Sequence, residues 1–341
     1  MIELSIIIPV YKVEKYIGRC IESVITQEKS GICMECIIID DCGPDQSMAI
    51  VRKIVDAYHG NIDFRIITHE RNRGVAAGRN TGFEAARGAF MMLIDSDDYL
   101  QEGCVEKLMN AQKAHPSADV IIGNFYSAEQ KEICWKDQKE TIVFDRQSDI
   151  RRKFLKVELN CFPWNRLLRR QFILDHKLFF REGTIFEDVL WAYHLFYEVN
   201  EVVLIPDSTY VYEFNPSSVM HSTREKSIET IRSFVLFCNE MLDQPYEEAM
   251  YVEHRLYVFN IMMKAIDTRM QASVTPEVSK SLDAVRSRLW HDALNHRQVL
   301  LVLFFLTAYP PFNLLLRTSW FRRHFDGIGH FIIRQSGKGS L

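Results

Sequence analysis

The feature that most constrains the fold is a short apolar run, residues 90–94, followed at once by the acidic segment 95–98. Such a run is typical of a strand that is buried on both faces, as in a parallel sheet. The carboxylates of Asp95, Asp97 and Asp98 would then leave the sheet together, at the strand end where open α/β sheets bind ligands. Grouped carboxylates repel one another, and an oxygen-binding divalent cation such as Mg²⁺ or Mn²⁺ relieves that repulsion.

Residues 95–98 have two other interpretations. Asp98 could cap a helix that begins near Glu102, since acidic side chains favour helix amino termini. A calcium-binding loop needs glycine at its sixth position, where this chain has Leu100, and is excluded on that ground. Because Asp-x-Asp is a short pattern with many accidental matches, the metal site and the helix cap both stay open at this point.

Composition excludes several classes of protein. With 341 residues, 25% of them charged and 47% hydrophobic, the chain can form a large globular domain and a smaller appendage. A net charge of −4 does not indicate a general nucleic-acid binder. The eight cysteines lack the spacing of a disulfide framework, and Cys33 and Cys36 form a lone Cys-x-x-Cys. We therefore expect a reducing compartment and, with no signal-like segment before the first strand, a cytoplasmic protein.

Strand and helix patterns alternate four times in the first hundred or so residues. The predicted strands are 4–8, 35–39, 64–67 and 90–94, and the predicted helices are 14–27, 48–58, 75–86 and 105–114. Residues 9–11 are expected to form a loop because of Pro9. Later strands are predicted at 118–124, 201–205 and 209–214, with a surface excursion at 127–139. The alternation predicts a mostly parallel, doubly wound α/β sheet.

Polar side chains at the other strand ends suit a nucleotide. Asp41 follows the second strand, where a carboxylate can accept hydrogen bonds from a base or ribose, and Tyr11 offers an aromatic face. Residues 71–74 and Arg79 bring guanidinium groups and a helix amino terminus to the same edge, which favours phosphate. Taken singly, Asp41 is more typical of a turn and Arg79 of a surface ion pair.

Four segments, 5–11, 39–47, 72–80 and 94–98, occur in an order and spacing that resembles the family 2 glycosyltransferases of the GT-A fold, of the bacterial cell-surface polysaccharide type. The resemblance implies transfer of a sugar from a nucleotide diphosphate sugar, of the UDP type, to a hydroxyl of a glycan or lipid-linked acceptor. It also implies Mn²⁺ or Mg²⁺ on the diphosphate. One departure is Cys42-Gly43-Pro44, where the family commonly has a Gly-Ser-Thr type of turn.

The resemblance also implies roles for single residues. The implied donor-site residues are Pro9, Tyr11 and Arg79 in the nucleotide pocket, Asp41 on the base, Asp95 facing the ribose, and Asp97 or Asp98 on the metal. Residues 161–168 and 183–191 resemble the acceptor-side motifs, which implies acceptor contacts for Trp164, Asn165 and Glu187, and makes Asp188 the candidate base. A single base without a second, nucleophilic carboxylate implies direct displacement with inversion.

These acceptor-side residues also have structural interpretations. Glu187 and Asp188 could merely complement the dipole of a helix that runs to Tyr197, and Trp164 could pack in the core. A non-catalytic nucleotide-sugar or glycan binding protein, which would tolerate loss of Asp188, is the alternative function. A dinucleotide oxidoreductase is disfavoured, because no Gly-x-Gly-x-x-Gly follows the first strand.

We expect a catalytic domain over residues 1–222, with a nucleotide-sugar half (1–115) and an acceptor half (116–222), and a helical region over 223–341. Within residues 212–222, which resemble a loop that folds over the diphosphate, Ser217, Ser218 and His221 are candidate contacts, as is Arg224 just after it. Residues 299–316 carry no charge but are divided by two prolines, so a membrane span is not expected. The basic and aromatic residues at 317–324 favour peripheral membrane binding, and a buried helical hairpin is the alternative.

Overall fold

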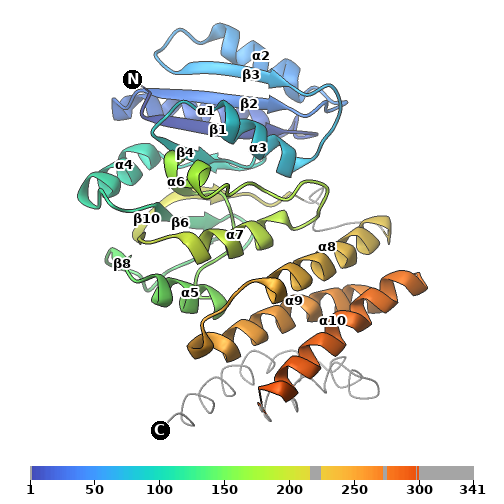
Figure 1. Cartoon of the computed structure of the whole chain (residues 1–341). Helices are drawn as coiled ribbons and strands as arrows, with labels where there is room; N and C mark the ends of the chain where they lie inside the picture. The colour runs from blue at the N-terminus through green and yellow to red at the C-terminus, as the bar shows by residue number, and fades with distance from the viewer. Residues whose placement is uncertain (1, 216–223, 272–274, 297, 299–341) are drawn as a thin grey trace. The chain divides into compact units, whose positions relative to one another are not determined.

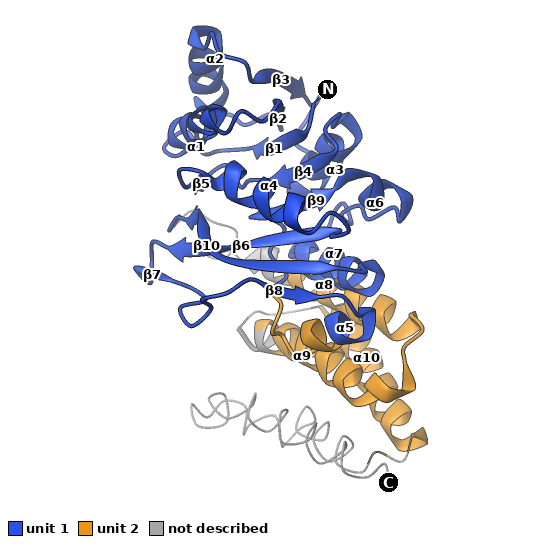
Figure 2. Cartoon of the chain, turned by 90° about the vertical axis from the view of Figure 1, so that its left-hand side faces the viewer, with its two compact units in different colours: residues 1–151, 160–218 blue, residues 152–159, 219–341 orange. Residues whose placement is uncertain are grey.

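The structure, a computed structural model, describes residues 2–215, 224–271, 275–296 and 298. The predicted boundary after residue 222, the candidate contacts Ser217, Ser218 and His221, the side chain of Arg224, and the predicted membrane-binding segment lie outside the described residues. The chain divides into two compact units, Met1–Arg151 with Asn160–Ser218 and Arg152–Leu159 with Val219–Leu341, coloured separately in Figure 2.

A mixed sheet organises the first unit, with strand order β3-β2-β1-β4-β9-β6-β10-β5 (Figure 1). The strands are β1 (Leu4–Val10), β2 (Met34–Asp40), β3 (Asp63–Thr68), β4 (Phe90–Leu93), β5 (Tyr99–Leu100), β6 (Val120–Ser127), β9 (Arg166–Arg169) and β10 (Val202–Tyr212), with β7 (Glu132–Ile133) beside β6 and β8 (Ile142–Phe144) beside β10. β1 to β4 are mutually parallel, which confirms the doubly wound arrangement predicted for this part.

Helices alternate with the parallel strands as predicted. They are α1 (Ile17–Ile25), α2 (Ser47–Ala57), α3 (Val75–Ala85) and α4 (Cys104–Ala114), followed later by α5 (Gln147–Leu155), α6 (Arg170–Asp175) and α7 (Glu187–Glu198). α1 begins three residues later than predicted and continues into a 3-10 helix, Thr26–Ser30. Its apolar face, which includes Ile17, Ile21 and Val24, is buried in the same core as β1 and β2.

Pro9 does not break the first strand, contrary to the prediction. The Val10 carbonyl accepts a hydrogen bond from Asp41 on the β2 side, and the Ile7 carbonyl accepts one from Ile94 on the β4 side. Because alternate residues of a parallel strand face opposite neighbours, Pro9 faces β4, whose pairing with β1 ends at Leu93. The missing N–H of Pro9 therefore costs no ladder hydrogen bond.

The later part of the sheet differs from the prediction mainly at β9 and β10, and the short strands β5, β7 and β8 were not predicted either. β9 was not predicted, and it lies antiparallel between β4 and β6. The two strands expected at 201–205 and 209–214 are one strand, β10, which runs parallel to β6 and shifts register between Leu204 and Tyr210. Pro206, which cannot donate a ladder hydrogen bond, lies within this register shift, so the strand continues past it.

The buried carboxylate of Glu35 connects the amino ends of the first strands through hydrogen bonds. Glu35 in β2 is fully buried, and its Oε1 accepts hydrogen bonds from Ser5 Oγ at 2.6 Å and from the Arg87 backbone N–H at 2.7 Å. Its Oε2 accepts from Arg65 Nη1 and Arg87 Nε, both at 2.8 Å. Burial opposes the charge, but these donors outweigh burial and lower the pKa of Glu35.

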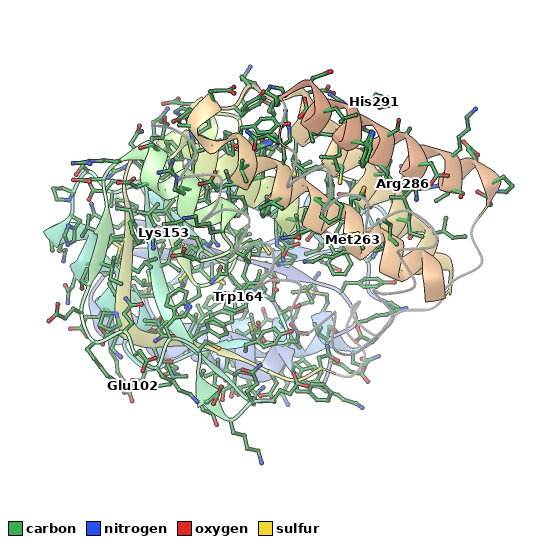
Figure 3. The ribbon with its side chains drawn as sticks, turned by 90° about the horizontal axis from the view of Figure 1, so that it is seen from below. Glu102, Lys153, Trp164, Met263, Arg286 and His291 are labelled. Carbon is green, nitrogen blue, oxygen red and sulfur yellow. The ribbon has the colours of Figure 1, made fainter. Side chains whose placement is uncertain are left out.

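The described residues of the second unit from Arg224 onward form α8 (Arg224–Asp243), a 3-10 turn (Glu248–Met250), α9 (Tyr251–Gln271) and α10 (Pro276–Asn295). Arg286 and His291 can be found on α10 in Figure 3. Asp292 of α10 accepts hydrogen bonds from Tyr251 and from Arg255 of α9, at 2.8 and 2.6 Å. Among the described residues, no helix combines the length and apolarity needed to cross a membrane.

Candidate active site

The acidic segment lies where β4 leaves the sheet, and hydrogen bonds from β10 hold it. Asp98, 1% exposed, accepts from the Tyr210 hydroxyl at 2.7 Å through Oδ2 and from the Glu213 backbone N–H at 2.8 Å through Oδ1. Asp97 Oδ2 accepts from Asn215 Nδ2 at 2.9 Å. Asp98 is not a helix cap, because α4 has Gly103 at its N-cap and no side-chain cap. The cap interpretation is therefore wrong.

Excess negative charge is concentrated in this segment. Burial raises the pKa of Asp98, and repulsion from Asp97 and Asp95 raises it further. Burial and repulsion from Asp95 likewise raise the pKa of Asp97. The residues fit a divalent cation that takes one or two carboxylates and completes its shell with water and phosphate oxygens. In the described part of the chain, no group of three or more His, Cys, Asp or Glu side chains forms a protein-only metal cage.

Asp41, at the carboxyl end of β2, holds the loop between β3 and α3. The side chain is 3% exposed, and its Oδ1 lies 2.7 Å from His69 Nδ1 and accepts from the Arg73 backbone N–H at 2.8 Å. Its Oδ2 accepts from the N–H of Gly74, whose φ of 87° is readily adopted only by glycine. Contact between Asp41 and a base remains a prediction; here the carboxylate shapes the loop.

Arg79 of α3 joins the two predicted halves of the site. It is 4% exposed, and Nη2 lies 2.8 Å from Asp95 Oδ1 while Nη1 lies 2.5 Å from Glu187 Oε1. Burial disfavours the guanidinium charge, but attraction from Asp95 and Glu187 outweighs burial and raises the pKa of Arg79. The arginine is thus a buried ion-pair centre rather than a surface ion pair, and its predicted contact with the nucleotide remains untested.

The acidic start of α7 carries the candidate base. Glu187 is 7% exposed and paired with Arg79, whereas Asp188 is partly exposed. The Cys161 thiol donates to Asp188 Oδ2 at 3.6 Å. Burial raises the pKa of Asp188, and attraction from Arg79 together with the thiol hydrogen bond opposes that rise. A partly exposed carboxyl group with a raised pKa has the properties of a general base.

Trp164 and Asn165, which were predicted to contact the acceptor, are both buried, and their contact with an acceptor stays a prediction. Trp164 is 5% exposed and packs parallel to Phe162, Tyr210 and Tyr212, so it has almost no surface to offer a sugar. Asn165 is 1% exposed, and its amide bridges β6 and β10. Its Nδ2 donates to the carbonyls of Gly123 and Asn124, and its Oδ1 accepts from Thr209.

The predicted nucleotide-pocket residues of the first strand behave differently from each other. Pro9 is buried in β1, and a Cβ added to Gly78 of α3 would lie 3.0 Å from it, so Pro9 packs closely against α3. Its place in the nucleotide pocket stays a prediction. Tyr11 is 39% exposed beyond the end of β1, with Lys12 Nζ 5.1 Å from its ring centroid. Tyr11 therefore remains available to a ligand.

Sequence reasoning missed several residues of the site. His69, which follows β3, connects Asp41 to Thr81 of α3 through its two ring nitrogens. Its position at the carboxyl end of a parallel strand was the available signal. Tyr210 and Asn215 contact Asp98 and Asp97 from more than a hundred residues away in the chain. Cys161 contacts Asp188 from another of the predicted motifs. Nothing in the local sequence pattern indicates these contacts.

Three comparisons with known proteins bear on this geometry. The family model described as Glycosyl transferase family 2 matches residues 5–176. EpsH of Bacillus subtilis (strain 168) is 29% identical over 235 residues, which is 67% of this chain and 65% of EpsH. The poly(ribitol-phosphate) beta-N-acetylglucosaminyltransferase TarS of Staphylococcus aureus is 24% identical over 255 residues, 73% of this chain and 42% of TarS. The chain therefore spans less than two thirds of each of these relatives.

Solved structures give the same fold. The crystal structure of S. aureus TarS 1–349 matches all of this chain and 93% of that one, with a TM-score of 0.68 at 18% identity, and TarS has also been crystallised with UDP-GlcNAc. A mannosyltransferase from Pyrobaculum calidifontis, in complex with GDP-Man and Mn²⁺, matches with a TM-score of 0.51 at 13% identity. With its parallel β1–β4 sheet, the acidic segment at the end of β4 and the family match over half of its length, this chain belongs to glycosyltransferase family 2 and has the GT-A fold.

Proposed function

We propose that the chain transfers a sugar from a UDP-sugar to a hydroxyl group of a glycan or lipid-linked acceptor, with inversion. The observation that carries the proposal is the position of Arg79, which pairs with Asp95 of the donor-side segment and with Glu187 beside the candidate base. One guanidinium thus fixes the acidic segment and the start of α7 in a single site. The UDP-GlcNAc complex of TarS supports the choice of donor.

We assign the metal to Asp97. Both oxygens of Asp98 already accept hydrogen bonds and the residue is buried, so Asp98 is better suited to fixing the end of β10. A divalent ion, when bound, supplies positive charge to the departing nucleoside diphosphate. Around it, Asp95 would face the ribose while Arg79 keeps its carboxylate in place.

Asp188 is assigned as the general base. Its carboxylate would take the proton of the acceptor hydroxyl while that oxygen bonds to the anomeric carbon and the bond from this carbon to the diphosphate breaks. The raised pKa of Asp188 brings its basicity closer to what proton transfer at neutral pH needs. Attack on the face opposite the leaving group gives the inverted product.

Nucleotide-sugar turnover tests the proposal. The full chain is incubated with a panel of nucleotide sugars, with Mn²⁺ or with a chelator, and release of nucleoside diphosphate is measured with and without candidate acceptors. The expected result is metal-dependent release from one class of UDP-sugar, faster with an acceptor. Binding of nucleotide sugars without any turnover across the acceptor panel would instead favour a non-catalytic binding protein.

A further inference from the structure

A hollow of about 430 Å³ lies at the amino end of β4, the end opposite to the acidic segment. Its lining includes three arginines, Arg87, Arg169 and Arg170, and two glutamines, Gln112 and Gln171. No Asp or Glu is among the described residues that line it. The charged side chains that line the hollow are therefore all basic, and none of its lining residues belongs to the candidate active site.

Two of the arginines are neutralised outside the hollow. Arg87 pairs with Glu35 and with Asp63. Arg169 donates to the carbonyl oxygen of Ala118 at 2.8 Å, and its Nε lies 3.7 Å from Asp119. These pairs hold both side chains in place and offset most of their charge.

Arg170 is the exception among these three. Its Nε is buried and has no hydrogen-bond partner, and its guanidinium forms no ion pair with a carboxylate in the described part of the chain. Native structures leave few buried donors without a partner. The backbone holds the residue firmly, because the Arg170 N–H donates to Ala89 and the preceding Arg169 pairs in register with Phe90.

We propose that this hollow binds a phosphate-bearing ligand through the guanidinium of Arg170, with the amide of Gln112 as a further donor. The planar guanidinium matches phosphate oxygens in a bidentate geometry. The volume exceeds that of a phosphate group alone, and the partly exposed side chain of Ile2 gives the rest of the ligand an apolar surface to pack on. The proposal does not depend on the proposed transferase activity, since the hollow lies at the other end of β4.

Binding of inorganic phosphate and glycerol 3-phosphate to the full chain tests the proposal, with chloride keeping ionic strength constant and UDP present to occupy the donor site. Both probes should bind the unmodified protein. Arg170→Gln should weaken that binding about tenfold or more, the effect of losing a charge-assisted hydrogen bond. Gln112→Glu should weaken it as well, by placing a carboxylate in the lining without altering an arginine. Arg52→Gln, an equal charge change on the exposed face of α2, should leave it unchanged.

Vesicles containing phosphatidylglycerol distinguish the source of the phosphate. If Arg170→Gln reduces binding to both the soluble probes and the vesicles, the ligand class includes lipid headgroups; if it reduces only the soluble probes, the ligand is a free phosphate ester. The proposal is overturned if the unmodified protein binds neither soluble probe, or if Arg170→Gln and Gln112→Glu, both folded by circular dichroism, bind the probes as tightly as Arg52→Gln does.

Discussion

Arg79 and Glu187, 108 residues apart in the chain, form a buried ion pair with 2.5 Å between Nη1 and Oε1. The pair connects α3, which follows the donor-side strands, to the first residue of α7. Because Arg79 also contacts Asp95, the relative positions of the acidic segment and the candidate base depend on this one guanidinium.

A double-mutant cycle measures that connection. Arg79→Met and Glu187→Gln, singly and together, should show a coupling in the free energy of unfolding of about 1–3 kcal/mol, because removing one partner leaves the other charge buried. Arg73 and Glu182 are the control pair, since they are 43% and 44% exposed and should couple by less than about 1 kcal/mol. Equal coupling in both cycles, measured by urea denaturation, would show that Arg79 is not a structural centre.

Substitutions of Asp97 and Asp98 are predicted to have different effects. Asp97→Asn should raise the Mn²⁺ concentration needed for half-maximal activity about tenfold or more while changing stability little, because its side chain makes fewer internal contacts. Asp98→Asn should lower thermal stability, because Asp98 fastens Tyr210 and the backbone at Glu213. Manganese titration and thermal denaturation of both variants separate the two roles, and the reverse pattern would exchange the assignments.

The Cys161 thiol is predicted to tune the candidate base. Its hydrogen bond lowers the pKa of Asp188, so Cys161→Ala should raise that pKa. Since a base must be ionised, the acid limb of the profile of kcat/KM against pH should move to higher pH, with the plateau at alkaline pH nearly unchanged. Cys161→Ser keeps a donor and should restore the original limb. A uniform loss at all pH values in both variants would point to misfolding instead.

The lowered pKa of Glu35 predicts that the first unit loses stability at acidic pH. Its pKa is lower in the folded than in the unfolded chain, so its contribution is present above the unfolded pKa, about 4.3, and is lost as pH falls through the lower folded value. Glu35→Gln should destabilise the protein by about 3 kcal/mol at neutral pH, because two arginines lose a buried partner. Urea denaturation checks this against Glu84→Gln, an exposed change on α3 that should stay within about 0.5 kcal/mol. Similar losses in both variants would contradict the role of Glu35.

The first half of the fold was predictable because its signals are local. Apolar runs at residues 4–8 and 90–94, each followed by a helical pattern, determine a parallel sheet, and polar residues at its carboxyl edge follow from that geometry. β9 is different. Its four residues have no strong strand pattern, and only pairing with β4 and β6, far away in sequence, makes them a strand.

The acceptor side shows what a pattern of residue types leaves undetermined. Trp164 and Asn165 have the chemistry of sugar-binding residues, yet contacts with β6 and β10 bury them, and those contacts come from distant parts of the chain. Glu35 is a different case, because a charged residue within a strand of buried residues needs a partner, although the sequence does not show which residue that is.

If Asp188 takes the acceptor proton, as proposed, its carboxylate is needed for transfer but not for binding of the nucleotide. Single-turnover transfer and nucleotide affinity should therefore be measured for Asp188→Asn and for the unmodified chain. We expect transfer to fall by about 100-fold or more while the affinity for nucleoside diphosphate stays within about twofold. Transfer by Asp188→Asn at the unmodified rate would show that Asp188 is not the base.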